Sequence, residues 1–152
     1  MSARVQLGHI AMPAKNPQQL ARFYGDFLGL DVTLKGSLPA MGEFVFLTDR
    51  RGEEMQTLAL MTRPEAAHTA WRVESLADLK GYYAEAQAQR VPIVFAFNHG
   101  VTLSLYLRDP EGNSVEIFWP TGQLPGGMQA APVDLNQPEE ALRALVGVAN
   151  PA

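Results

Sequence analysis

The chain repeats its own residue pattern at a spacing of about sixty positions. A shift of 59 aligns residues of the same kind through the early part of two copies: His9 with His68, Ala11 with Ala70, Leu20 with Leu79, Tyr24 with Tyr83 and Val32 with Val91. A shift of 60 continues the match with Phe46 and Tyr106, Leu47 and Leu107, Asp49 and Asp109, Gly52 and Gly112, and Gln56 and Glu116. A small loop insertion between two strands explains the slip. Two homologous modules are therefore expected, over residues 5–61 and 67–119.

The first module is expected to begin with a strand and a capped helix. Residues 5–12, VQLGHIAM, alternate as a strand does. Asn16 stands where an N-cap is favoured, Pro17 follows at the first helical position, and Gly29 ends the helix. One apolar stripe is predicted along this helix, made of Leu20, Phe23, Tyr24, Phe27 and Leu28.

The second module has the same order of elements. A strand over residues 68–73 precedes a helix capped by Ser75 and Asp78, and Pro92 prevents the helix from extending. Strand-like runs follow the two helices: residues 32–34, 43–48 and 55–61, then 92–97, 102–108 and 114–119. The unit is β-α-β-β-β, twice. We predict one α+β domain over 1–152, in which two βαβββ modules form a curved mixed sheet around a cup.

Residues 120–152 lie outside the repeat and are predicted to form a tail with a short helix. Proline and glycine are frequent as far as Pro132, and a helix start follows at 136–139. One apolar face is expected on this helix, made of Ala141, Leu142, Leu145 and Val146. The helix would dock on the body or on a second subunit; a partly ordered tail is the alternative.

Composition excludes several classes of function. The net charge of −4 and the lack of a Lys/Arg cluster disfavour nucleic acid and anionic membranes as partners. No basic N-terminal region precedes a long apolar run, and no segment approaches the ~18 apolar residues of a membrane span, so a cytoplasmic protein is expected. Because cysteine is absent, any metal must be held by nitrogen and oxygen ligands.

Strand alternation places three metal-binding side chains on the polar side of the predicted sheets. His9, His68 and Glu116 each point away from the bulky apolar residues of their strands, towards the cup. A buried carboxylate is costly unless it is paired or bound to a metal. Two imidazoles and one carboxylate are the ligand set that leaves three positions open on Fe(II) or Mn(II). The alternatives are hydrogen-bonded core histidines and a glutamate that faces water.

The turn at residues 109–113 predicts the register of the last hairpin. If Arg108 pairs with Ser114, Tyr106 lies directly opposite Glu116, about 5 Å away on one face. A slip of one residue would separate them.

The chain resembles the vicinal-oxygen-chelate superfamily of glyoxalase, bleomycin-resistance and extradiol dioxygenase proteins over about residues 5–119. The stretch LGHIAMPAKNPQQLARFYGDFLGLDV is similar to the opening module of that superfamily, and RDPEGNSVEIFW to its closing hairpin. The stretch HGVTLSLYLRDPEGNSVE resembles the extradiol dioxygenase signature. The residues that fit are His99, Leu105, Tyr106, Asp109, Pro110, Gly112 and Glu116. Phe97 departs from the pattern, which has a smaller or polar residue there.

This resemblance implies a ring-cleaving dioxygenase that acts on a catecholic aromatic with O2. His9, His68 and Glu116 would be the ligands of Fe(II), or else of Mn(II), and a catechol would chelate the ion through both oxygens. Among the remaining residues, His99 would hydrogen-bond the oxygen species and donate a proton, Tyr106 would hold a substrate hydroxyl, and Phe46 would pack on the ring.

One departure concerns acid–base chemistry. The dioxygenases carry a further histidine near the end of the first module, and Gln56 occupies that place here. Glutamine can donate and accept hydrogen bonds but cannot take up a proton. General acid–base help is worth ~10²–10⁴ in rate, so ring cleavage would be slow, absent, or dependent on a deprotonated substrate.

Three other functions compete with ring cleavage. A glyoxalase-type isomerase or lyase would use Gln56 as a fourth ligand and favour Ni(II) or Zn(II). A non-enzymatic small-molecule-binding protein would have lost the metal ligands. A fosfomycin-modifying transferase would need a cationic cluster that this chain lacks. A homodimer is expected, with the site built either within one chain or across the dimer.

Overall fold

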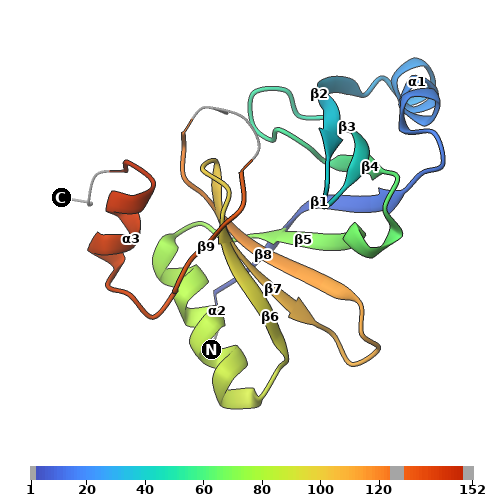
Figure 1. Cartoon of the computed structure of the whole chain (residues 1–152). Coiled ribbons are helices and arrows are strands. Elements are labelled where there is room, and N and C mark those ends of the chain that lie inside the picture. The colour runs from blue at the N-terminus through green and yellow to red at the C-terminus, as the bar shows by residue number, and fades with distance from the viewer. Residues whose placement is uncertain (1–2, 124–128, 149–152) are drawn as a thin grey trace. The chain divides into compact units, whose positions relative to one another are not determined.

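The structure, a computed structural model, describes residues 3–123 and 129–148 (Figure 1). The chain divides into two compact units. Residues 7–70 form the first unit, and residues 71–152 with the N-terminal residues 1–6 form the second. Each unit combines strands with helices, so the α+β prediction is confirmed. The assignment of both modules to one domain stays a prediction.

The first unit follows the predicted order of the first module. Its elements are β1 (Gln6–Pro13), α1 (Pro17–Leu28), β2 (Asp31–Leu38), β3 (Gly42–Thr48), β4 (Leu58–Met61), a 3₁₀ turn (Pro64–Ala66) and the start of β5 (His68–Arg72). The strand order is β2-β3-β4-β1. Antiparallel pairs join β2, β3 and β4, whereas β1 lies parallel to β4, which makes the sheet mixed.

Helix α1 is capped as its sequence predicts. The Asn16 side chain accepts a hydrogen bond from the Gln19 backbone N–H at 3.0 Å, and Pro17 takes the first helical position. Gly29 ends the helix in the left-handed conformation, with φ at 74°.

The predicted apolar stripe of α1 is wrong for three of its five members. Ala21 is buried, and Leu20 and Tyr24 pack on the same core cluster. The exposed members are Phe23, Phe27 and Leu28, which are 53%, 76% and 56% exposed. The helix contacts its sheet along a narrow face that includes the small Ala21, so the larger apolar residues beyond that face remain on the surface.

The second unit carries the second module and the tail. Its elements after β5 are α2 (Leu76–Gln89), β6 (Ile93–Asn98), β7 (Thr102–Arg108), β8 (Ser114–Pro120), β9 (Ala131–Pro132) and α3 (Glu139–Leu145). The strand order is β8-β7-β6-β9, and each of these neighbouring pairs is antiparallel. Ser75 and Asp78 form the predicted capping box, and α2 ends at Gln89, before Pro92.

The predicted register of the last hairpin is confirmed. Arg108 pairs with Ser114, and Tyr106 lies opposite Glu116. The Asp109 carboxylate stabilises the turn by accepting hydrogen bonds from the Glu111 and Asn113 backbones and from the Asn113 side chain. The hydrogen bonds from Asn113 lower the pKa of Asp109 more than the other contacts of this carboxylate do.

The tail packs against the second unit. Leu135, Leu142 and Val146 belong to the same core cluster as the buried residues of α2, β7 and β8. Strand β9 pairs with β6, and the Lys80 ammonium donates to the backbone carbonyl of Leu135 at 3.0 Å and to that of Gln137. Docking on the body is thereby confirmed, but Leu145 is 55% exposed and does not belong to the buried face.

The buried face of α3 yields a matched pair of variants. Leu142 is fully buried, so Leu142→Ala should lower the free energy of unfolding by about 2–5 kcal/mol. Leu145→Ala, on the exposed side of the same helix, should change it by less than about 0.5 kcal/mol. Urea denaturation followed by circular dichroism measures both values. Equal effects of the two substitutions would show that the tail does not depend on the Leu142 contact.

Candidate functional site

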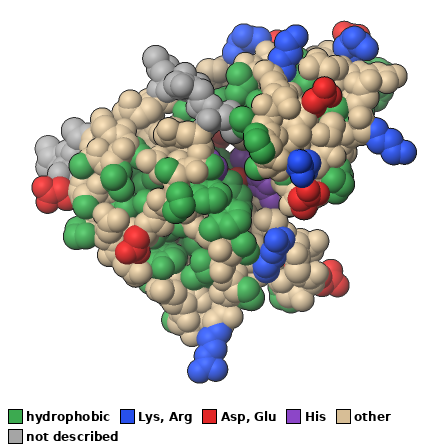
Figure 2. Space-filling model, viewed as in Figure 1, with side chains coloured by type: hydrophobic (Ala, Val, Ile, Leu, Met, Phe, Trp, Pro, Cys, Tyr) green, Lys and Arg blue, Asp and Glu red, His purple; other side chains and the backbone are tan. Residues whose placement is uncertain are grey.

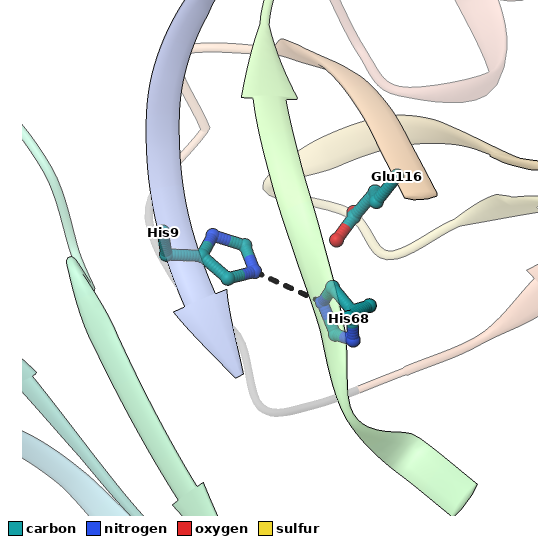
Figure 3. A group of neighbouring side chains, drawn as sticks. All are labelled: His9, His68 and Glu116. Atoms are coloured by element: carbon teal, nitrogen blue, oxygen red, sulfur yellow. Dashed lines mark hydrogen bonds between the residues drawn. The ribbon is translucent and has the colours of Figure 1, made fainter. Parts of the chain in front are cut away.

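Two imidazoles meet in the first unit. His9 lies on β1 and His68 begins β5, and their Nε2 atoms are 3.1 Å apart (Figure 3). The rings meet edge to face, with centroids 5.2 Å apart. His9 is only 6% exposed. The pairing of repeat-equivalent histidines that the sequence predicts is therefore present in the structure.

The backbone determines which nitrogen of His68 carries the proton in the neutral ring. His68 Nδ1 lies 2.7 Å from the Ala66 carbonyl oxygen. A carbonyl oxygen only accepts, so Nδ1 carries the proton and the neutral ring keeps a lone pair on Nε2. A metal-binding histidine is held in the same way, with its other nitrogen donating to a carbonyl or a carboxylate. The 3₁₀ turn that ends at Ala66 thus orients His68 Nε2 towards His9.

Gln56 lies beside this pair. Its Nε2 is 3.5 Å from His9 Nε2. Its buried Oε1 finds no hydrogen-bond partner among residues 3–123 and 129–148. A half-turn of the amide exchanges the two atoms and brings the oxygen to the side of His9. An unpaired buried acceptor is costly, so this oxygen would be stabilised by a polar or cationic partner, which the described residues do not supply.

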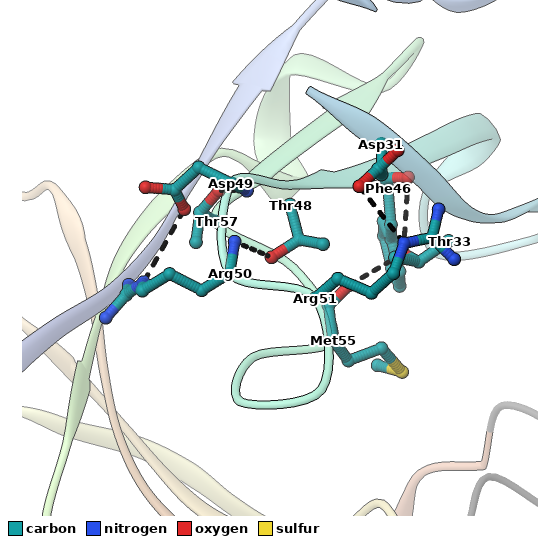
Figure 4. A network of polar contacts seen from close by, with 9 residues as sticks. All are labelled: Asp31, Thr33, Phe46, Thr48, Asp49, Arg50, Arg51, Met55 and Thr57. Atoms are coloured by element: carbon teal, nitrogen blue, oxygen red, sulfur yellow. Dashed lines mark hydrogen bonds and ion pairs between the residues drawn. The ribbon is translucent and has the colours of Figure 1, made fainter. Parts of the chain in front are cut away.

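The loop that carries Gln56 is anchored on both sides of that residue. Thr33 Oγ1 donates to the Met55 carbonyl at 2.6 Å, and the Thr57 backbone N–H donates to the Leu47 carbonyl at 2.8 Å (Figure 4). The Arg51 guanidinium holds Asp31 at 3.0 Å and lowers the pKa of that carboxyl, first through the hydrogen bond and then through its charge. These hydrogen bonds therefore hold the backbone that carries the Gln56 side chain.

The second unit presents the carboxylate and the tyrosine. Glu116 lies on β8 with 4% of its surface exposed, directly across from Tyr106 on β7. Burial raises the pKa of the Tyr106 phenol well above its usual value, and the neighbouring Glu116 carboxylate raises it further. Tyr106 therefore remains a protonated hydroxyl near neutral pH and can donate a hydrogen bond.

His99 is held between Tyr106 and the tail. Its Nε2 is 3.1 Å from the Tyr106 hydroxyl, and its Nδ1 is 2.7 Å from the Gln129 carbonyl oxygen. Because that carbonyl can only accept, Nδ1 carries the proton and Nε2 accepts from Tyr106 in the neutral ring. The next residue, Gly100, has φ at 79°, and a Cβ there would lie 2.7 Å from Gln129 Nε2. Glycine at this turn thus lets the tail approach His99.

Phe46, which the repeat aligns with Tyr106, has different surroundings. It is 1% exposed and lies 4.8 Å from Phe44, ring centroid to ring centroid. Its strand neighbours Val45 and Leu47 pack on the core below α1. A role for Phe46 in substrate contact stays a prediction.

The sequence-predicted residues are divided between the two units, and a common site for His9, His68 and Glu116 stays a prediction. His9, His68 and Gln56 lie together in the first, and His99, Tyr106 and Glu116 lie in the second. Within the first unit, His9 and His68 each offer a ring nitrogen of the kind that binds a metal ion. Two contributors were missed by sequence reasoning: the carbonyls of Ala66 and Gln129, which no side-chain pattern reveals. Among the described residues no helix is long and apolar enough to cross a membrane.

Known proteins are similar to this chain in sequence and in fold. The family model of the Glyoxalase/Bleomycin resistance protein/Dioxygenase superfamily matches residues 6–117. The biphenyl-2,3-diol 1,2-dioxygenase 3 of Rhodococcus globerulus is 32% identical over 129 residues, which cover 77% of this chain and 64% of that protein. The chain thus spans less than two thirds of this relative's length.

Solved structures share the fold at low identity. The 2,2',3-trihydroxybiphenyl 1,2-dioxygenase of Sphingomonas wittichii strain RW1 superposes with a TM-score of 0.63 at 20% identity, over 82% of this chain and 43% of that one. The Mn(II)-bound glyoxalase of Novosphingobium aromaticivorans gives 0.60 at 15% identity, over 76% and 40%. At these identities the likeness shows the fold alone.

The hydrogen bonds of His99 predict its tautomer. In metal-free protein, at a pH where the ring is neutral, nitrogen-15 NMR should find the proton on Nδ1. Tyr106→Phe should shift the Nε2 resonance, because its donor is lost, and leave the proton on Nδ1. A proton on Nε2 in the unsubstituted protein would contradict the role given to the Gln129 carbonyl.

Proposed function

Because the chain belongs to the Glyoxalase/Bleomycin resistance protein/Dioxygenase superfamily, we propose that it is a metal-dependent, extradiol-type dioxygenase. Its substrate is a catechol-like aromatic diol and its oxidant is O2. One diol and one O2 give one ring-opened product: the ring bond beside the diol breaks, and both oxygen atoms enter the product. No further reductant is consumed.

In this proposal His9, His68 and Glu116 bind one divalent metal ion, Fe(II) first and Mn(II) second. The imidazole pair fits an ion. Two ring nitrogens at about 2.1 Å from one ion and at a right angle are about 3.0 Å apart, close to the 3.1 Å between the Nε2 atoms. When bound, the ion supplies a centre that holds the diol and O2 in contact.

The chain's own residues hold the substrate and a proton. Tyr106, whose O–H donates to His99 Nε2, accepts a hydrogen bond from a substrate hydroxyl at its phenol oxygen. His99 Nε2 is the proton-accepting or proton-donating atom beside it, and Nδ1 is tied to the Gln129 carbonyl. This hydrogen-bonded pair is the observation that carries the proposal, because the competing functions give neither residue a specific role.

The relatives support the same substrate class. The Rhodococcus relative acts, by its name, on biphenyl-2,3-diol, which is an aromatic diol. A second relative of 27% identity has the same named substrate. A cytoplasmic location, a homodimer, and a site built either within one chain or across the dimer accompany this proposal as predictions.

One observation favours a second function. The Gln56 amide, with its Nε2 3.5 Å from His9 Nε2 and its buried Oε1 unpaired among the described residues, stands where a fourth ligand of a glyoxalase-type isomerase or lyase would lie. Such an enzyme would bind Ni(II) or Zn(II) through His9, His68, Glu116 and Gln56 and would use no O2.

Oxygen uptake separates the two functions. Anaerobically purified, Fe(II)-loaded protein should consume one O2 per catechol, and labelled O2 should place both atoms in the product. Gln56→His should raise kcat with catechol by about 10²-fold, because it adds the proton acceptor that glutamine lacks. Gln56→Ala should leave metal affinity within about threefold. Consumption of methylglyoxal with glutathione, and loss of metal in Gln56→Ala, would establish the second function instead.

The three histidines allow a controlled test of the metal ligands. His68→Ala should stay folded and lose stoichiometric metal, measured by elemental analysis after dialysis. His99→Ala, which removes the third histidine, should retain it. Metal retained by His68→Ala would remove His68 from the site.

Metal affinity should also depend on pH. Imidazole binds metal only when neutral, so affinity should fall as the pH drops below about 6.5. A metal-binding titration between about pH 5 and 8 measures this dependence. An affinity that does not change over this range would exclude histidine ligands.

A further inference from the structure

A β-bulge in β6 reverses the faces of its side chains. Ile93 pairs with Leu107, but Phe95 pairs with Tyr106, so Val94 is an extra residue in the strand. Simple alternation would place Phe95 and Phe97 on the same face as Ile93, against the core. After the bulge, Ala96 packs on the core, and the two phenylalanines turn to the face of Tyr106.

Four rings line that face as a result. Phe95 and Phe97 are stacked at 4.4 Å between centroids, and Phe95 lies 4.7 Å from the Tyr106 ring. Phe97 lies edge-on to His99 at 5.8 Å. We call Phe95, Phe97, His99 and Tyr106 the aromatic wall. All four belong to the second unit, and their mutual distances do not depend on the first.

The aromatic wall is open on one side. Phe95 is 40% exposed, and neither phenylalanine belongs to the buried core. Hydrophobic side chains gather over β6 and β9 in the space-filling view (Figure 2). The stacked rings form an apolar area on this face of the sheet. Polar groups lie next to it on the same face: Ser104, Tyr106 and Glu116. Binding sites for small aromatic molecules have this composition.

We propose that Phe95 and Phe97 form the specificity-determining part of the substrate site. They contact an apolar aryl substituent of the diol, while Tyr106 and His99 contact its hydroxyl end. The inference rests on the proposed function and narrows its substrate class. The preferred diols carry a second ring, and unsubstituted catechol leaves the phenylalanine pair uncovered. Phe97, the one departure from the dioxygenase signature, thereby acquires a role.

The test compares two substrates and three single variants. Catechol and biphenyl-2,3-diol are the substrates, and Phe95→Leu, Phe97→Leu and Phe27→Leu are the variants. Leucine keeps apolar volume and removes the ring face. Phe27 is an exposed phenylalanine on α1 and serves as the matched control. Circular dichroism checks folding, and because Phe95 is part-exposed, Phe95→Leu carries the test if Phe97→Leu fails to fold.

The expected result is a change in preference. Either wall variant should lower kcat/KM for biphenyl-2,3-diol relative to catechol by about tenfold, mainly through KM. Phe27→Leu should leave that ratio unchanged. If this ratio is unchanged in both wall variants while ring cleavage is intact, Phe95 and Phe97 do not determine specificity. The proposed function is not affected by that result.

Anaerobic binding of biphenyl-2,3-diol, measured by calorimetry, separates the two claims. Binding that weakens about tenfold in the wall variants, in a protein that does not cleave the diol, would support the wall and reject ring cleavage. Binding of equal strength in all variants would contradict a contact between the two phenylalanines and the diol. Absence of any binding would contradict it as well.

Discussion

The structure of the first unit depends on two imidazole nitrogens held 3.1 Å apart. His68 Nδ1 donates its proton to the Ala66 carbonyl, so in the neutral ring the lone pair is on Nε2, which lies next to His9. A His9 ring with its proton on Nε2 donates a hydrogen bond to that lone pair, whereas a ring with its proton on Nδ1 places two lone pairs side by side, an arrangement that suits a cation. The parallel placement of β1 beside β4, and the turn before β5, hold the nitrogens at that distance. The buried Oε1 of Gln56 adds a third electron-rich atom to the same neighbourhood.

The second unit provides a different chemistry. It contributes one buried carboxylate, one phenol that stays protonated and one imidazole whose tautomer is set by a backbone carbonyl. That carbonyl belongs to Gln129, beyond the residues 6–117 that match the family model. The tail thus has two roles: it closes the core through Leu142 and holds His99. An aromatic substrate would meet apolar rings and polar donors on one strand face, which suits a diol whose two ends differ in polarity.

Much of the fold follows from local signals. The caps at Asn16 and Ser75 and the turn at Asp109 use short-range hydrogen bonds, which a residue pattern determines by itself. Two predictions fail for one reason. The stripe on α1 and the placing of Leu145 on the buried face of α3 follow from apolar content, but the contact area of a helix is set by the surface below it. The bulge at Val94 is invisible because alternation assumes an uninterrupted ladder.

The repeat by itself determined the β-α-β-β-β order of each module and the equivalence of His9 and His68, and the turn at residues 109–113 determined the opposition of Tyr106 and Glu116. All of these depend on spacing along the chain, which the order of residues records. Tertiary structure alone decided which nitrogen of each histidine carries the proton, that the Gln56 amide is buried with an unpaired oxygen, and that two phenylalanines leave the core. The physical reason is that these properties depend on backbone carbonyls, strand bulges and burial. Those features arise only when distant segments pack together, and side-chain identity does not encode them.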